Sequence, residues 1–340
     1  MKTTIIYLLI LVICCCPGCK NSSDTERYQN KRNNILFVKE YIKEIEIEDV
    51  LIGQFARLYT INNYLLISDG RSIDKLIHIF NKNNYNYVTS IIDRGQGANE
   101  IASIGFIGIN EANNKIYVTD YGKQTIFDLC MDSVITNPRY IPQIKMTLNE
   151  RQFPDNYQYI NDTLLIGRIV EPTGNSGYNH TVAKIKTNTG EIKLMKYKHP
   201  KIEKKRICFA ASTEHNAYVE CYHYHDLMTF YDLDGNFKYN IYGKKWDNKT
   251  TNKFGYYEKV LFCNDKIIVS YGNGKDRFSN SENGYPTQLL IFSIDGTYIQ
   301  TLETEYSILD FCYDKDNNRI IMSLDENIQF AYLSLDKIIS

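Results

Sequence analysis

The sequence predicts an all-β protein, a six-bladed β-propeller whose ring is closed by an N-terminal strand. The first observation is a turn followed by a short apolar strand, a pattern that occurs six times at intervals of 48 to 53 residues. Four-stranded blades repeat at roughly 40 to 45 residues, so these intervals indicate blades with moderately long loops. The fourth residues of the recurring strands are Ile67, Val118, Ile166, Val219, Val269 and Met322.

The second observation is a cluster of turn-forming residues just before each of these strands. Asn and Asp tolerate left-handed backbone and hydrogen-bond to their own main chain, so they mark the turns of hairpins. The strands themselves are apolar on both faces, as Ile116, Tyr117 and Val118 show, which fits strands covered by neighbouring blades. The clusters are Asn62–Asn63, Asn113–Asn114, Asn161–Asp162, His215–Asn216, Asn264–Asp265 and Asp316–Asn318.

The third observation concerns the two ends of the chain. Each unit continues into a second strand, and most units then reach another turn and a further strand, but the last unit has only Leu335–Ser340 left after its second strand. An N-terminal strand within Ile35–Ile52 is expected to fill that position, and closure of the ring removes exposed sheet edges. A β-sandwich or solenoid built from the same hairpins is the alternative architecture.

Residues 1–18 are expected to be a targeting segment and not part of the fold. Lys2 supplies a positive charge, and the apolar run Ile5–Cys16 is too short to span a bilayer comfortably but has the length of a signal-peptide core. The run ends with Gly18 directly before Cys19, and here the sequence resembles a bacterial lipoprotein signal. The resemblance implies cleavage before Cys19 and acylation of that residue.

Two alternatives stay open at this end of the chain. Cys15 or Cys16 is a further candidate for the modified residue, and an ordinary secretory peptide is the competing interpretation of the leader. Residues 19–34 are polar, charged and without periodicity, which predicts a flexible tether between the lipid and a propeller domain at 35–340. Several acyl chains on one Cys would attach the domain stably to a membrane of the bacterial cell envelope, the outer membrane being the expected one.

Composition excludes some classes of function. The formal net charge of -1 gives no overall attraction to nucleic acid or to an anionic membrane surface. The cysteines beyond Cys19 are odd in number, widely spaced and without a CxxC pair, so they do not form a disulfide framework, although Cys208 and Cys221 are candidates to lie close together in one blade. The basic run Lys201–Arg206 is expected to be a solvated loop between blades three and four.

A glycine-containing element, RGQGANE, precedes the second unit, and NKIYVTD follows it at Asn114–Asp120. With these elements the chain resembles the six-bladed propeller lipoproteins of Bacteroidetes, which are similar to TolB-like and NHL propellers. Gly95, Gly97 and Glu100 match the GxGxxE pattern of those proteins, whereas Ala98 and Asn99 replace their usual Pro-Gly. The resemblance covers about residues 36–335 and implies a fold and a location but no activity. A phosphate-binding role would need a helix after the glycines, and the sequence there predicts a strand.

The first candidate site is the axial funnel of the ring. Asp69 and Asp120 end the recurring strands of units one and two, and Arg168 holds the matching position in unit three. Together they are candidates to bind a divalent cation or a polar solute, as the acidic and Asn ligands of calcium-dependent lactonase-type propellers do. The alternative is that each Asp binds the amides of its own turn.

The second candidate is a set of possible metal ligands in blade four. If the stretch Val219–Asp226 is extended, Cys221, His223 and His225 share one face. Cys and His are zinc ligands, but residues two apart on a straight strand converge poorly on one tetrahedral ion. The alternative is a strand and loop whose histidines are exposed or pack against aromatic rings.

No nucleophile motif such as GxSxG is present in the sequence. The leading expectation is therefore a lipid-anchored, non-enzymatic module of the cell envelope that binds a protein, peptide or glycan, with long loops at Glu171–Asn179 and Gly272–Gly284 on its rim. A divalent-metal-dependent hydrolase or lactonase with its site in the funnel is the second hypothesis. A subunit of an outer-membrane assembly is the third.

Overall fold

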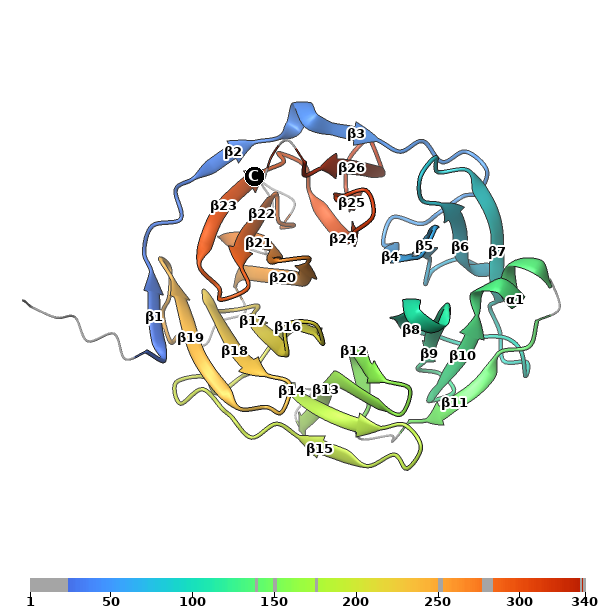
Figure 1. Ribbon diagram of the computed structural model, residues 1–340, viewed down its shortest axis with the longest axis horizontal. Coiled ribbons are helices and arrows are strands. Elements are labelled where there is room, and N and C mark those ends of the chain that lie inside the picture. The colour runs from blue at the N-terminus through green and yellow to red at the C-terminus, as the bar shows by residue number, and fades with distance from the viewer. Residues whose placement is uncertain are drawn as a thin grey trace, which may run out of the picture.

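The computed structural model describes residues 24–137, 140–148, 152–174, 177–249, 253–276, 284–336 and 338. Six sheets are arranged in a ring around a central axis, which confirms the predicted six-bladed β-propeller (Figure 1). The described helices are short: the 3-10 helices η1 (Lys39–Tyr41) and η2 (Glu111–Asn113), and α1 (Met131–Thr136). None of them has the length and apolar character needed to cross a bilayer. The predicted leader and Cys19 lie outside the described residues.

Blades one to three each contain four antiparallel strands, which follow one another from the hub of the ring outward. Blade one has β4 (Arg57–Ile61), β5 (Tyr64–Ser68), β6 (Lys75–Asn81) and β7 (Tyr87–Asp93). Blade two has β8 (Ile104–Asn110), β9 (Lys115–Asp120), β10 (Thr125–Cys130) and β11 (Gln143–Thr147). Blade three has β12 (Pro154–Asn161), β13 (Leu164–Gly174), β14 (Gly177–Lys186) and β15 (Ile192–Leu194).

Blades four to six each receive their outermost strand from the N-terminal end of the chain. Blade four has β16 (Ile207–Ser212), β17 (Ala217–Tyr222), β18 (Leu227–Asp232), β19 (Phe237–Gly243) and β1 (Glu26–Gln29). Blade five has β20 (Phe254–Cys263), β21 (Lys266–Asp276), β22 (Gln288–Ser293), β23 (Tyr298–Glu303) and β2 (Ile35–Phe37). Blade six has β24 (Ile308–Asp314), β25 (Arg319–Leu324), β26 (Phe330–Ser334) and β3 (Ile42–Glu44).

The N-terminal segment, residues 24–45, follows the outside of the ring across three blades (Figure 1). β3 pairs antiparallel with β26, so a strand from within Ile35–Ile52 completes the last blade as predicted. β1 and β2 add parallel strands to blades four and five, which the sequence did not indicate. The flexible tether predicted for 19–34 is therefore wrong for residues 26–34, because strand pairing and side-chain contacts hold them against the ring.

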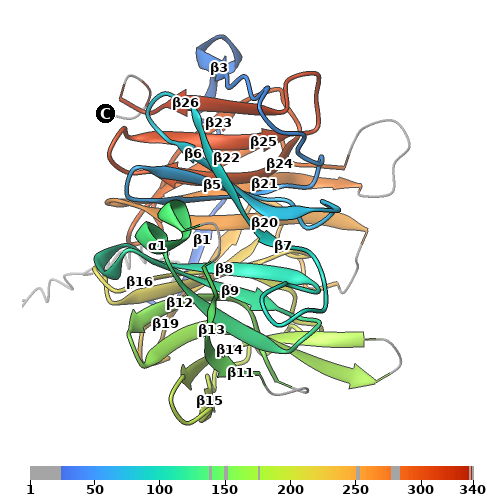
Figure 2. The same cartoon turned by 90° about the vertical axis from the view of Figure 1, so that its right-hand side faces the viewer.

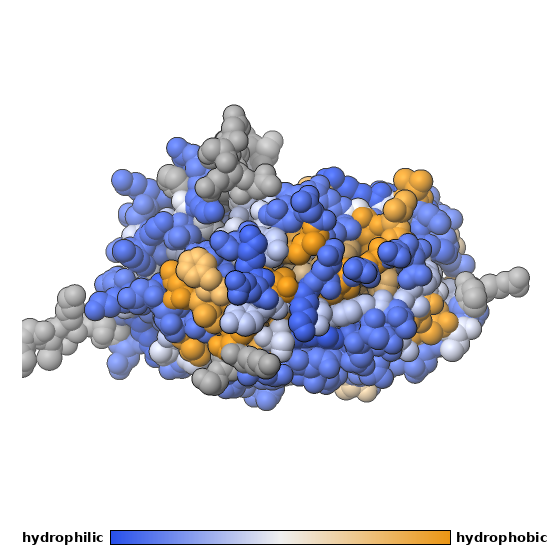
Figure 3. Space-filling view, turned by 90° about the horizontal axis from the view of Figure 1, so that it is seen from above, coloured by the Kyte–Doolittle hydropathy of each residue, from blue (hydrophilic) through white to orange (hydrophobic). Residues whose placement is uncertain are grey.

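The edge of the ring that this segment covers is only partly polar. Figure 3 views it from outside and shows hydrophobic patches within a mainly hydrophilic surface. Ile35 and Phe37 of β2 are among the exposed apolar side chains there, because a strand at a sheet edge alternates between inward and outward positions.

Apolar packing between adjacent blades forms the core. Leu66 of blade one meets Ile107 and Val118 of blade two in one cluster, and all three side chains are fully buried. Equivalent clusters join the other blades, so each central strand is covered on both faces. This explains why the recurring strands are apolar throughout.

The turn clusters have a second role beyond reversing the chain. Asn62, Asn114, Asn216, Asn264 and Asn318 all have φ between 41° and 51° at the turn between the first two strands of their blades. This left-handed conformation favours Asn over most residues, which accounts for the repeated Asn in the sequence. Asn62 also donates to the Asn114 side chain at 2.8 Å, so these turns connect neighbouring blades as well.

Two predicted loops differ from the structure. Most of Glu171–Asn179 belongs to β13 and β14, whose hairpin extends past the neighbouring strands (Figure 2). β21 likewise continues to Asp276, so the start of the loop predicted at Gly272–Gly284 is a strand, and residues 277–283 lie outside the described ranges. The basic run Lys201–Arg206 does connect blades three and four, between β15 and β16, as predicted.

The GxGxxE element connects blades one and two, between β7 and β8. Glu100 accepts a hydrogen bond from the Gly97 amide at 2.8 Å, and a Cβ atom on Gly95 would overlap the Glu100 carboxylate. Neither glycine has positive φ, so their role is to leave room for the Glu100 side chain. The residues that follow form the strand β8, as predicted.

Candidate functional site

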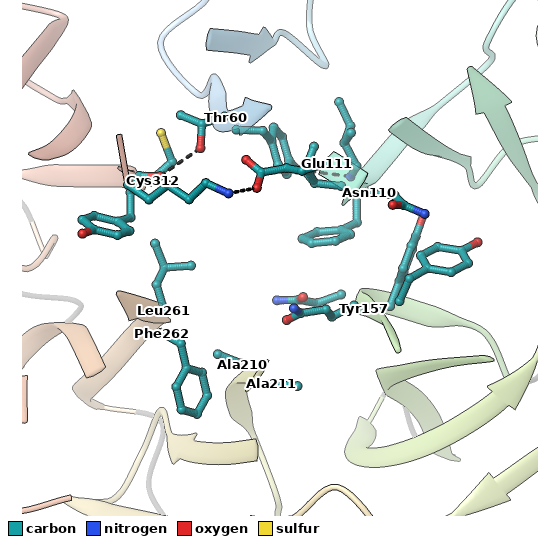
Figure 4. Close-up of a pocket in the computed structure, with 18 of the residues that line it drawn as sticks. Thr60, Asn110, Glu111, Tyr157, Ala210, Ala211, Leu261, Phe262 and Cys312 are labelled. Atoms are coloured by element: carbon teal, nitrogen blue, oxygen red, sulfur yellow. Dashed lines mark hydrogen bonds and ion pairs between the residues drawn. The ribbon is translucent and has the colours of Figure 1, made fainter. Parts of the chain in front are cut away.

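A cavity of about 690 Å³ occupies the hub of the ring (Figure 4). We call it the hub cavity. Its wall is built by the innermost strand of every blade, so side chains more than 250 residues apart in sequence face the same space. One lining residue from each blade, in chain order, is Thr60, Ile109, Gln158, Ala210, Leu261 and Cys312.

β12 contributes two carboxamides to this wall. Along this strand Asn156 and Gln158 alternate with Tyr157 and Tyr159, and alternate residues of a strand point to opposite faces. The two tyrosines are buried between blades, whereas the Gln158 side chain is exposed within the cavity wall. Neither carboxamide has a hydrogen-bond partner among the described residues, so both are available to a ligand.

The lysines in the wall are paired with carboxylates. Lys259 of blade five pairs with Asp310 of blade six at 2.6 Å, and the Leu58 amide of blade one donates to the same carboxylate at 2.7 Å. Glu111 and Lys315 form an ion pair that joins blades two and six, drawn as a dashed line in Figure 4. With these lysines paired, the wall offers amides, hydroxyls and apolar surface to a ligand. It also contains the Asp162 carboxylate, which has no ion-pair partner among the described residues and accepts from the Asn113 side chain at 2.8 Å.

The thiol of Cys312 lies in the wall but is not activated. Burial raises the pKa of Cys312 well above its ordinary value, which exceeds the opposing effect of the Lys259 charge. A nucleophilic cysteine needs a lowered pKa because the thiolate is the reactive form. Cys312 therefore acts as a small apolar side chain here.

Asp69 and Asp120 bind backbone amides. Asp69 accepts hydrogen bonds from the amides of Gly53 at 2.7 Å and Arg71 at 2.8 Å. Asp120 accepts from Ala102 and Gly122, each at 2.9 Å. The Arg71 and Gly122 amides belong to the turns that follow the aspartates, as the alternative predicted, whereas Gly53 and Ala102 lie in the segments that precede the blades. Neither aspartate lines the hub cavity. The reason is topological: both stand at the end of the second strand from the hub, whereas the wall is formed by the strand before the turn cluster.

Arg168 is also occupied locally. Its guanidinium forms a bidentate pair with Asp155 at 2.7 and 2.8 Å and donates to the Ile207 carbonyl, which joins blade three to blade four. The structure therefore does not bring Asp69, Asp120 and Arg168 together around one ligand. Each of them stabilises its own blade or the junction with the next.

The possible metal ligands of blade four point in different directions. β17 ends at Tyr222, so the stretch is not extended beyond that residue. The Cys221 side chain is buried beside Cys208, its direct partner across the strand pair, whereas His223 contacts the Tyr257 carbonyl and His225 approaches the Asp247 carbonyl at 3.2 Å. The described residues contain no group of three His, Cys, Asp or Glu side chains arranged to hold a metal ion.

Sequence reasoning missed the hub cavity because it took the recurring strand as the inner one. The signal that would have located the wall is the segment before each turn cluster. In blade three this segment reads NYQY, where polar and aromatic residues alternate, as expected for a strand with one solvated face.

A model of a protein family described as a 6-bladed beta-propeller, DUF5128, matches residues 22–253. Among solved structures, a Bacteroides vulgatus member of the DUF4221 family is similar with a TM-score of 0.62 and 10% identity over 89% of this chain and 98% of that one. A Bacteroides fragilis protein described as exported has a TM-score of 0.55 and 12% identity, with 88% of each chain covered.

A luciferin-regenerating enzyme has a TM-score of 0.54 and 9% identity over 86% of this chain and 94% of that one. No curated protein matches the sequence. Identities this low show a shared fold, and none of these similarities transfers an activity.

Proposed function

Because the chain belongs to this family of six-bladed β-propellers, and a propeller presents side chains from all of its blades at the hub, we propose that it is a non-enzymatic binding module. Its ligand is an uncharged polar chain, a segment of glycan or peptide, that enters the hub cavity. The observation that carries the proposal is the wall of that cavity, where unpartnered carboxamides stand among aliphatic and aromatic side chains.

The wall favours a ligand that forms hydrogen bonds but carries no charge. A buried charge needs an opposite partner, and the lysines that line the cavity already have carboxylate partners. Carboxamides donate and accept hydrogen bonds at once, which suits the hydroxyls of a sugar or the amides of a peptide. The volume of about 690 Å³ lies within the usual range of ligand pockets, so part of a chain would fit.

We place the module in the bacterial cell envelope, attached to the outer membrane through acylated Cys19. The leader and the Gly18-Cys19 junction support this location. The similar fold of a Bacteroides fragilis protein described as exported is consistent with it.

We expect Gln158→Ala to weaken ligand binding about tenfold or more, because the ligand group that bonded the carboxamide would be left unpaired in the cavity. The full chain is screened by thermal shift against neutral oligosaccharides and uncharged peptides, and positive compounds are titrated by calorimetry. Glycan and peptide arms of the screen distinguish the two ligand types.

Gln143→Ala is the matched control, since Gln143 is an exposed carboxamide on the outer strand β11. It should leave the affinity unchanged. Equal affinities for the Gln158 variant and the unaltered chain would show that the ligand binds elsewhere and would refute the hub as the site.

A further inference from the structure

The charges of the chain are unevenly distributed despite the net charge of -1. Residues 193–206 and 238–249 together contain eleven of the 39 Lys and Arg residues but only two of the 40 Asp and Glu residues. The rest of the chain therefore carries ten more acidic than basic residues. The first segment begins at the end of β15 in blade three and leads to β16 of blade four, and the second contains most of β19 and the chain after it.

Side-chain contacts hold the first basic segment next to the N-terminal strand. The carboxamide of Asn240 in β19 donates to the Tyr197 hydroxyl at 3.0 Å and to the Glu26 carboxylate of β1 at 3.1 Å. Figure 1 shows the chain between β15 and β16 reaching the outer edge of blade four near β19. The point where the described chain begins is thus beside the basic segment.

A second set of contacts fixes the same arrangement. His199 bonds the Tyr242 hydroxyl at 2.9 Å, and the same hydroxyl contacts Glu26. His199 also packs edge-on against Trp246, with ring centroids 5.5 Å apart. Burial lowers the pKa of His199 to about 4, so at neutral pH it is an uncharged structural contact and the positive charge comes from the lysines around it.

Most exposed lysines beside these contacts have ammonium groups without a partner among the described residues, although Lys245 donates to the Asn273 carbonyl at 2.6 Å. Lys205 of the first basic segment is also paired, with Glu220 at 2.6 Å. We define the blade-four lysine surface by the exposed lysines within three residues of Tyr197, His199 or Trp246 whose ammonium groups have no hydrogen-bond or ion-pair partner among the described residues: Lys196, Lys198, Lys201, Lys244 and Lys249.

We propose that the blade-four lysine surface binds the phosphate groups of anionic lipid headgroups in the membrane that holds the N-terminus. The proposal rests on the envelope anchor proposed above. Cys19 precedes Glu26 by seven residues, which span at most about 25 Å when extended. The anchor would therefore hold blade four close to the bilayer, where clustered lysines are attracted to anionic headgroups.

The lysine surface would strengthen the membrane attachment that the lipid anchor provides, although the formal net charge of -1 gives no sign of it. A basic cluster beside an acyl chain strengthens membrane attachment, and it also turns one edge of the ring toward the lipid. The attraction decreases with salt because exposed charges are screened beyond about 8 Å at physiological ionic strength.

The test measures co-sedimentation with vesicles of the chain without its leader, residues 19–340, carrying Cys19→Ser so that neither the apolar leader nor an acyl group contributes. We expect binding to vesicles of phosphatidylcholine with 30% phosphatidylglycerol, little binding to phosphatidylcholine alone, and loss of binding at high salt. In this background Lys196→Glu combined with Lys198→Glu should reduce binding at least tenfold, since each lysine near the surface contributes about fivefold.

The control is Lys39→Glu combined with Lys43→Glu, which changes the net charge equally at exposed positions near blade six. It should reduce binding less than twofold. Equal losses in the two double variants, or no preference for anionic vesicles, would overturn the proposal, as would binding to heparin without binding to vesicles. Affinity for a hub ligand is measured on the same variants and should not change, so failure here is distinguishable from failure of the binding function.

Discussion

Arg32→Ala is expected to lower the free energy of unfolding by about 3–5 kcal/mol, because it leaves the buried Asp226 carboxylate without its cationic partner. Arg32 donates to Asp226 at 2.9 Å and to the Tyr257 hydroxyl at 2.8 Å, and the side chains of Arg32 and Asp226 are only 7% and 1% exposed. Burial opposes the charge on Arg32, but Tyr257 and Asp226 outweigh it and raise the pKa of the guanidinium further. Urea unfolding followed by circular dichroism measures the effect.

Arg27→Ala is the control, five residues earlier in the same segment. Arg27 lies 3.5 Å from the ring centroid of Tyr239 and donates to the Asp295 carbonyl at 3.0 Å, but it pairs with no buried carboxylate among the described residues. Loss of such a cation–π contact at a partly exposed site costs about 0.5–1 kcal/mol. If the two variants unfolded at the same urea concentration, the buried pair of Arg32 and Asp226 would not contribute the predicted stability.

Asp314→Asn is expected to lower the free energy of unfolding by about 3 kcal/mol or more at pH 7, because Asp314 neutralises two buried cations where blade six meets blade one. Its carboxylate, fully buried, lies 3.0 Å from Lys82 and 2.9 Å from Arg319. Lys82 belongs to the turn after β6, so the pair connects the first blade to the last. The same unfolding assay, repeated at several pH values, checks the prediction.

The direction in which the pKa of Asp314 is shifted determines how the effect of this substitution on stability depends on pH. Burial alone would raise the pKa of Asp314, but hydrogen bonds from Asn317 and Lys82 and the charges of Lys82 and Arg319 outweigh it and lower the pKa. A lowered carboxyl pKa gives stability that is complete above the unfolded-state value of about 3.9 and is lost as the pH falls through the folded-state value. The difference between the unaltered chain and the Asn variant should therefore stay constant from pH 5 to 8 and shrink below about pH 4.

Asp316 provides the comparison for this prediction. It contacts the same Lys82 at 2.6 Å, but its side chain is 54% exposed. Exposed ion pairs contribute about 0–1 kcal/mol, so Asp316→Asn should have a small effect. Equal effects of the two substitutions would contradict a role for burial at this junction.

Much of the ring was predictable because its signals are local and repeated. Asn114 and Asn264 mark turns whose left-handed backbone selects Asn, and each precedes a strand buried on both faces. The early end of the last blade predicted closure by a strand within Ile35–Ile52, and β3 confirms it. These features follow from local turn propensity and from a repeat of 48 to 53 residues along the chain.

The N-terminal contacts were not predictable from local patterns. Residues 26–34 have a polar composition typical of tethers, and the partner of Arg32 lies 194 residues away. The hub wall was missed for a related reason: carboxamides on β12 give no sequence signature of binding until the ring places them at its axis. The lysine surface was hidden because acidic residues elsewhere cancel its charge in the total.

Hydrogen exchange of the full chain, followed by mass spectrometry, tests most directly whether the N-terminal segment is a structural part of the ring. In the N-terminal segment, the Val38 amide donates to the carbonyl of Glu303 and the Ile45 amide to that of Phe330, at 2.8–2.9 Å. In the other direction, the Thr301 amide of β23 donates to the Asn34 carbonyl at 2.8 Å. We expect peptides covering residues 35–45 to exchange as slowly as peptides from β26 and to lose protection together with them in Arg32→Ala. Complete exchange of residues 26–45 within seconds, while β26 stays protected, would contradict closure of the ring by this segment.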